Sequence, residues 1–270
     1  IIVGALSGVS VGQMFLAGAV PGVLMGLAMM VTCYVVSVRR NFPRQDWRGF
    51  GEVARAFGGA FWALAMTFLI IYGLLSGLAT PTETAVVASV YAFIVGAFIY
   101  GELPIRQTPK IMVDSAVSAG GILALVGFAN VFGWILVSER IPQAIAEGVL
   151  SITDNRFVVI LLINLLLLFV GMFMETIAAL IILFVPLLSL AEAVGIEPLH
   201  FATFAVLNLM IGLTTPPVGV CLFVCAGIAR LPLSKVIVAV LPFLATNILV
   251  LLLVSYYPPV ATWLPSLLAR

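Results

Sequence analysis

Two short polar clusters interrupt a very apolar sequence, and each contains residue types that bind ions. The first is Val170-Gly-Met-Phe-Met-Glu-Thr176, where Glu175 is the single charged residue between Phe157 and Ala191. An ionisable group at bilayer depth costs roughly 2.5–3.5 kcal/mol on insertion scales and suggests a function. No basic residue in this stretch can neutralise Glu175. Either a cation from solution compensates its charge, or the carboxyl group is buried, protonated and held by a structural hydrogen bond.

The second cluster is Asn208-Leu-Met-Ile-Gly-Leu-Thr-Thr-Pro-Pro-Val-Gly219. The two prolines break the helical hydrogen-bond ladder, and the glycines permit unusual dihedral angles. The cluster therefore predicts two half-helices, although a simple kink is the alternative. Freed carbonyls and threonine hydroxyls suit a hard cation such as Na⁺, whereas free amides at a helix N-terminus attract an anion. Helical spacing places Asn208, Gly212 and Thr215 on one face, which we expect to line the site.

Other polar residues have simpler interpretations. Thr80-Pro-Thr-Glu83 fits a helix capping box with proline at the first helical position, and we favour this over a role in transport. Cys221 and Cys225 share a predicted helix face and are expected to be buried small residues rather than a metal pair. His200 is the single histidine, in an expected loop position without a catalytic partner. With no nucleophile–base pair and no GxxxxGK[ST] phosphate loop, the sequence favours neither an enzyme nor an ATPase.

Composition determines the environment of these clusters. The 270 residues are 63% hydrophobic and 9% charged, with a mean hydropathy of +1.28. Soluble domains carry about 25% charged residues, so a soluble globular domain is excluded. Disorder and nucleic-acid binding require more charge, and the net charge is only +1. Three cysteines form no disulfide framework.

The charge-free stretches predict an all-α integral membrane protein with about seven embedded segments. These are residues 11–38, 56–77, 84–101, 115–138, 157–191, 201–229 and 236–257. Basic residues in Arg39–Arg55, at Arg106 and Lys110, and at Arg230 and Lys235 indicate cytoplasmic loops. Both ends of residues 157–191 then lie outside, which predicts a re-entrant hairpin of two half-membrane helices with its tip near Gly171–Thr176.

Several stretches of the sequence, taken together and in their order, resemble those of a known family. GLATPTETAVVASVYA (77–92), LLLLFVGMFMETIAALIILFVPLL (165–188) and LMIGLTTPPVGVCLFV (209–224) occur in this order, with IPQAIAEGVL (141–150) and LPFLATNILVLLLVSYYPP (241–259). With them the chain resembles the large membrane (permease) subunit of the tripartite ATP-independent periplasmic (TRAP) transporters of the dicarboxylate or sialic-acid type. Members of this family usually have Asp where Glu175 stands.

The resemblance implies Na⁺-coupled secondary uptake of a small organic acid across the bacterial inner membrane. The substrate would be a C4-dicarboxylate or a sialic-acid-like compound, delivered by a periplasmic binding protein. A small membrane subunit would complete the complex, and Na⁺ would be the transported coupling ion. The implied fold is an elevator-type transporter with two inverted repeats. The alternative function is a cation/proton antiporter of similar broken-helix design.

This resemblance also divides the chain into expected parts. The chain would hold the C-terminal three-fifths of a full subunit, with one re-entrant hairpin and one Pro-broken helix. The parts are the end of the first repeat (1–38), a cytoplasmic amphipathic connector (39–57), scaffold helices (58–138), an external arm (139–156), a transport block (157–229) and a C-terminal spanning helix (236–258). The block is expected to move against residues 57–101 and 236–257.

The expected site lies where the hairpin tip and the broken helix face each other. The candidate Na⁺ ligands are Gly171, Glu175, Thr176, Gly212, Thr214 and Thr215. The candidate substrate contacts are Asn208, Pro216, Pro217 and Gly219. Bound Na⁺ and the amides after Pro217 would attract a substrate carboxylate.

Overall fold

The computed structural model describes residues 2–42, 49–75 and 79–268, and this part of the chain is helical with short connections and no strand. The all-α fold class is confirmed. Among these described residues, six helices are long and apolar enough to cross a membrane. They are α2 (Val11–Arg39), α3 (Phe50–Leu75), α4 (Pro81–Ile94) with its continuation to Ile99, α7 (Arg156–Phe173), α8 (Thr176–Ala193) and α11 (Leu233–Tyr256). The chain forms two compact units, Ile1–Arg40 with Leu125–Arg270 and Asn41–Ala124.

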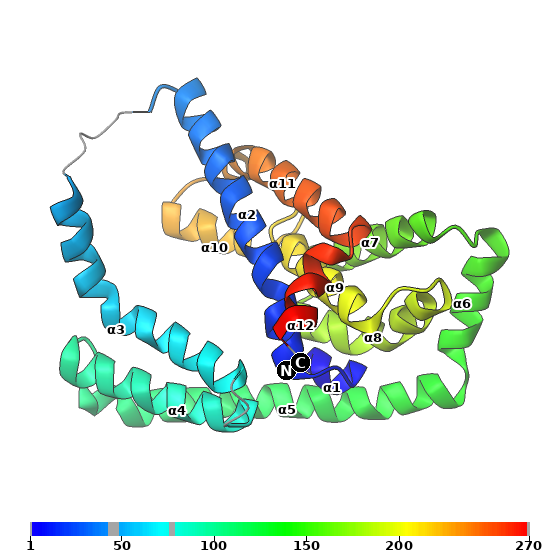
Figure 1. Cartoon of the computed structure of the whole chain (residues 1–270), viewed down its shortest axis with the longest axis horizontal. Coiled ribbons are helices and arrows are strands. Elements are labelled where there is room, and N and C mark those ends of the chain that lie inside the picture. The colour runs from blue at the N-terminus through cyan, green and yellow to red at the C-terminus, as the bar shows by residue number, and fades with distance from the viewer. Residues whose placement is uncertain (1, 43–48, 76–78, 269–270) are drawn as a thin grey trace. The chain divides into compact units, whose positions relative to one another are not determined.

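The larger unit is built around α9 (Pro198–Gly212), which contacts α2, α7, α8 and α11 (Figure 1). The described part of this unit also contains four short helices. Among them, α1 (Ile2–Ser7) and α6 (Ile141–Ile152) pack on α8, α10 (Val220–Ala229) packs on α11, and α12 (Pro259–Leu268) packs on α2. The expected external arm of residues 139–156 therefore contains α6, while its placement outside the membrane stays a prediction.

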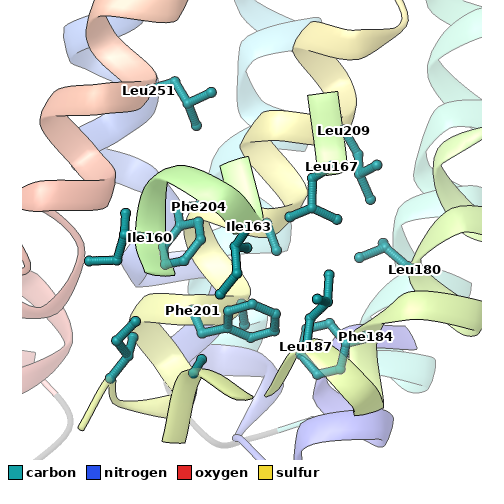
Figure 2. Packing of buried hydrophobic residues seen from close by; sticks show 14 of the residues in the cluster. Ile160, Ile163, Leu167, Leu180, Phe184, Leu187, Phe201, Phe204, Leu209 and Leu251 are labelled. Carbon is teal, nitrogen blue, oxygen red and sulfur yellow. The ribbon is translucent and has the colours of Figure 1, made fainter. Parts of the chain in front are cut away.

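Interlocking side chains fill the space between α7, α8 and α9. Figure 2 shows Ile160 and Ile163 of α7 near Phe201 and Phe204 of α9. Leu167 of α7 lies beside Leu209 of α9, and all six side chains are buried. The rings of Phe184 and Phe201 lie 5.2 Å apart, and those of Phe201 and Phe204 meet edge-on at 5.4 Å. Lipid tails are as apolar as these side chains, so close packing and interhelical hydrogen bonds hold such helices together.

The smaller unit pairs α3 with α4, and two tyrosines fasten this pair. The hydroxyl groups of Tyr91 and Tyr100 donate hydrogen bonds to the backbone carbonyls of Trp62 (2.9 Å) and Gly59 (2.8 Å). After α4, a π-helical stretch (Val95–Ile99) and a 3₁₀ turn (Ile105–Gln107) lead into α5 (Thr108–Ser138). The first part of α5, as far as residue 124, belongs to this unit.

A capping box starts α4. The backbone N–H of Glu83 donates to the Thr80 hydroxyl (3.3 Å), and the Thr80 backbone N–H donates to the Glu83 carboxylate (2.7 Å), with Pro81 in the first turn. This confirms the structural interpretation of Glu83. The residues just before the box, 76–78, lie outside the described residues, as do residues 43–48 of the expected connector. Residues 50–57 of that connector form the first turns of α3.

The hairpin helices are longer than we expected. α7 and α8 have 18 residues each, which corresponds to ~27 Å at 1.5 Å per residue. The hydrocarbon core of a bilayer is about 30 Å thick, so each helix reaches well beyond half of it. The prediction of two half-membrane helices is therefore wrong in length. The apolar runs extend to the turn itself, and no residue before Met174 stops α7 earlier.

Candidate ion and substrate site

Glu175 caps a helix at the turn between α7 and α8. α7 ends at Phe173 and α8 begins at Thr176, so Met174 and Glu175 form the connection. One carboxylate oxygen of Glu175, Oε2, accepts hydrogen bonds from the backbone N–H groups of Ile177 (2.9 Å) and Ala178 (3.2 Å). The negative charge also complements the positive end of the α8 dipole.

The Glu175 side chain is exposed in the described part of the chain, so the interpretation as a buried side chain is wrong. The capping bonds use Oε2, while Oε1 accepts no hydrogen bond from the described residues. Glu175 thus combines a structural bond with an oxygen that is open to a further ligand. The sequence suggested each of these roles separately but not their combination.

The broken helix consists of two helices with a non-helical connection. α9 ends at Gly212 and α10 begins at Val220, which confirms the predicted half-helices and excludes a simple kink. The hydroxyls of Thr214 and Thr215 each donate to the carbonyl oxygen of Ile211 at 2.8 Å and thereby close the end of α9. Both hydroxyl protons are therefore used in hydrogen bonds, and the oxygen lone pairs remain as possible ligands of a cation.

Backbone carbonyl oxygens are available at this break. In the described part of the chain, the carbonyls of residues 214–218 accept no hydrogen bond. These oxygens follow the C-terminus of α9, where the helix dipole adds partial negative charge. Oxygen-rich, partly negative surroundings of this kind suit a hard cation.

Most backbone amides after the prolines are already used, in contrast to our expectation. Gly219 N–H donates to the Met172 carbonyl (3.1 Å), Cys221 N–H to Leu213 (3.1 Å) and Leu222 N–H to Gly219 (2.7 Å). The N–H groups of Val218 and Val220 have no acceptor among the described residues. An anion at the start of α10 would therefore meet these two amides rather than a full helix N-terminus.

The hairpin turn and the break in the second helix lie against each other. A Cβ atom on Gly212 would lie 2.6 Å from the Cα atom of Gly171, so the backbones of α7 and α9 touch at this crossing. The hydrogen bond from Gly219 to Met172 and a 3.8 Å contact from the Thr176 hydroxyl to the Met210 sulfur join the same two motifs. Gly219 itself has a left-handed φ of +49°, which favours glycine. The structure thus brings together Gly171, Thr176, Gly212 and Gly219.

Asn208 does not share this position. Its side chain is fully buried and donates to the backbone oxygen (2.9 Å) and side-chain oxygen (2.7 Å) of Asn164 in α7. Ser255 of α11 donates to the same Asn164 side-chain oxygen at 3.3 Å. Asn208 therefore connects helices in the core through its amide nitrogen, whereas its buried Oδ1 has no hydrogen-bond partner among the described residues. Its contact with a substrate stays a prediction. Asn164 was missed, although an asparagine in the apolar run of α7 was the available signal.

The candidate substrate prolines differ in accessibility. Pro216 is half-buried and Pro217 is exposed, whereas Thr215 beside them is buried. Their backbone carbonyls belong to the set that accepts no hydrogen bond within the described residues. Both prolines could therefore offer a carbonyl oxygen to a cation, in addition to the predicted contact with a substrate.

Two other sequence interpretations change. His200 lies in the first turn of α9 rather than in a loop, is 1% exposed, and has its Nε2 atom 2.8 Å from the Val254 carbonyl oxygen. Cys221 is half-buried and Cys225 is exposed, so neither is the buried small residue that we expected. All faces of α10 are apolar, so the sequence of this helix does not indicate which face is buried. Among the described residues, no three His, Cys, Asp or Glu side chains form a metal-binding group.

Interrupted helices that meet inside a multi-pass membrane protein are the architecture of secondary transporters. The family model described as "Tripartite ATP-independent periplasmic transporter, DctM component" matches residues 1–260, and the chain belongs to this family. It is therefore a multi-pass protein of the bacterial inner membrane, in a family of permeases rather than enzymes.

Curated relatives show the same membership. The chain is 39% identical to the sialic acid TRAP transporter large permease protein of Vibrio cholerae, over 99% of this chain and 62% of that protein. It is 35% identical to the C4-dicarboxylate large permease of the same organism, over 99% and 64%. An isethionate TRAP transporter permease of Oleidesulfovibrio alaskensis is 36% identical, over 96% and 41%. The chain thus spans less than two thirds of the length of these relatives.

Proposed function

We propose that this chain is the C-terminal part of a large permease subunit that couples the uptake of a small organic acid to Na⁺. The substrate would be a C4-dicarboxylate or a sialic-acid-like compound, brought by a periplasmic binding protein. A small membrane subunit would complete the transporter. The names of the relatives support this class of substrate, since they refer to sialic acid, C4-dicarboxylates and isethionate.

The observation that carries the proposal is the contact between the hairpin turn and the broken helix. Glu175 offers a carboxylate oxygen there, and residues 214–218 offer carbonyl oxygens at the negative end of α9. The proposed ligands of Na⁺ are these oxygens and the lone pairs of Thr176, Thr214 and Thr215. Gly171 and Gly212 permit the close approach of the two backbones.

The same site would attract the substrate in a second step. A bound Na⁺ adds positive charge beside the amides of Val218 and Val220, which start α10. A carboxylate placed there would interact with the cation and with these N–H groups. We therefore expect Na⁺ to bind before the substrate, because the two amides alone provide a weak anion site. Pro216, Pro217 and Gly219 fix the path of the backbone that presents them.

The hairpin, the broken helix and α11 would move together. We expected the C-terminal helix to stay with the scaffold. However, α11 bonds to α9 through His200 and Val254, and to α7 through Asn164 and Ser255. Breaking such buried polar contacts in each transport cycle would be costly. The moving unit is therefore proposed to include α7 to α11.

The test is substrate uptake by the complete transporter in proteoliposomes. The full-length large subunit, its small subunit and its binding protein are reconstituted, and radiolabelled sialic acid, succinate and isethionate are offered separately. We expect uptake of one of these acids to require an inward Na⁺ gradient and to stop when K⁺ replaces Na⁺.

Two results would contradict the proposal. Equal uptake in the presence of Na⁺ and of K⁺ would show that Na⁺ is not the coupling ion. Exchange of Na⁺ for protons without any organic acid would instead identify the cation/proton antiporter of similar design. A pH-sensitive dye inside the vesicles distinguishes this exchange from acid uptake.

A further inference from the structure

A basic groove lies where the end of α2 meets the start of α11. It is lined by Arg40, Ser234, Lys235, Val238 and Ala239, and its volume is about 460 Å³. This volume is within the range of small-molecule sites, about 300–1,000 Å³. The groove is distinct from the hairpin turn and the broken helix, and none of its residues has a part in the proposed Na⁺ site.

The antiparallel arrangement of α2 and α11 places both cations at one membrane face. Arg40 follows the last residue of α2, Lys235 lies in the first turn of α11, and the two helices pack against each other. A hydrogen bond of 2.6 Å between the hydroxyls of Thr32 and Thr246 fixes their register further along. The excess of basic residues at these ends indicates the cytoplasmic face.

The lining changes from polar to apolar along α11. Ser234 and Val238 are four residues apart, as are Lys235 and Ala239, so each pair is stacked on one helix face. The polar member of each pair is nearer the helix end, and the apolar member is one turn deeper towards the bilayer. Val238 is 60% exposed, so an apolar surface continues from the basic end of the groove.

We propose that this groove binds the headgroup of an anionic phospholipid from the cytoplasmic leaflet. The phosphate would lie between the Arg40 guanidinium and the Lys235 ammonium, with the Ser234 hydroxyl as a further donor. Val238 and Ala239 would contact the upper part of an acyl chain. Free phosphate would satisfy the two charges but would leave the apolar wall uncovered, and this favours a lipid. Basic pockets between helices on the cytoplasmic side are typical sites for such headgroups.

The binding experiment uses the full-length large subunit with its small subunit, purified in detergent. Phosphatidylglycerol and phosphatidylcholine are titrated in mixed micelles, and retained lipids are counted by native mass spectrometry. One basic residue near an anionic surface contributes about fivefold in affinity, so removal of two predicts a loss of roughly 30-fold. We expect Arg40→Gln/Lys235→Gln to show this loss for phosphatidylglycerol and little change for phosphatidylcholine. Arg40→Lys/Lys235→Arg should keep most of the affinity.

The matched control is Arg106→Gln/Lys110→Gln, which removes the same charge from two exposed residues outside the groove. An equal loss in this control would show a general effect of charge and overturn the proposal. Equal affinity of the wild-type protein for both lipids would also overturn it. If inorganic phosphate displaced phosphatidylglycerol at equal concentration, the groove would be a phosphate site rather than a lipid site.

Discussion

The carboxylate of Glu175 caps α8, and we propose that it also binds Na⁺, so that the side chain has one oxygen for each task. Its two backbone hydrogen bonds converge on Oε2. A substitution that keeps the acceptor but removes the charge therefore separates the two tasks. Glutamine is such a residue because its amide oxygen accepts hydrogen bonds and carries no formal charge.

We expect Glu175→Gln in the complete transporter to weaken activation by Na⁺ about tenfold. A pair of opposite charges about 4 Å apart contributes ~1–4 kcal/mol, depending on solvent screening. Thermal stability should change little, because the cap is retained. Glu175→Ala is the control, since it should lose the cap as well, which costs about 1 kcal/mol. Wild-type Na⁺ affinity in Glu175→Gln would leave Glu175 with a capping role alone.

At the scale of helices, the crossing of α7 and α9 depends on two glycines. Figure 2 shows the large side chains that fill the space between these helices, and Gly171 and Gly212 are where the backbones themselves meet. Small residues at such crossings are common in membrane proteins because they maximise packing.

We expect Gly212→Ala to destabilise the protein, because the added Cβ atom would lie 2.6 Å from Cα and 2.7 Å from the carbonyl carbon of Gly171. Overpacking of this kind typically costs 1–3 kcal/mol. Gly227→Ala in α10 is the matched control, since a Cβ atom there would meet nothing within 4 Å. Thermal unfolding of both variants of the full-length subunit in detergent measures the difference. Equal stability of the two variants would refute the tight crossing.

The positions of the helix breaks could be predicted from sequence, because proline, glycine and a lone charge act locally. The break after Gly212, the turn at Glu175 and the capping box at Thr80 are of this type. The partners of buried polar groups could not be predicted in this way. Whether Asn208 faces a site or Asn164 depends on which helix lies beside it, and this is a property of the tertiary structure.

The threading of the whole molecule rests on loop charge, and the hairpin is its most specific consequence. α7 and α8 are joined by only two residues, Met174 and Glu175. Loop charge predicts that the chain reverses its direction through the membrane at this turn. Their outer ends, near Asn155 and Glu192, should therefore lie on the same side of the membrane.

Single cysteines at Asn155 and Glu192 test this arrangement in intact cells. A membrane-impermeant thiol reagent should label both from the periplasm, after the natural cysteines at positions 33, 221 and 225 are replaced by serine. A cysteine at Lys110 is the cytoplasmic control and should react only in opened cells. Labelling of positions 155 and 192 from opposite faces would rule out the hairpin.

The hydrogen bond between Thr32 and Thr246 joins residues 214 positions apart, and it bears on how the protein is made. α2 leaves the ribosome long before α11 and α12, the helices against which it packs. In the interval, the Thr32 hydroxyl can bond only to its own helix, at the Ala28 carbonyl 3.0 Å away. Asn164 is likewise synthesised before its hydrogen-bond partners Asn208 and Ser255. Completion of the larger unit is therefore a late event in biosynthesis, and a chain interrupted before α11 would lack the contacts of that helix with α2, α7 and α9.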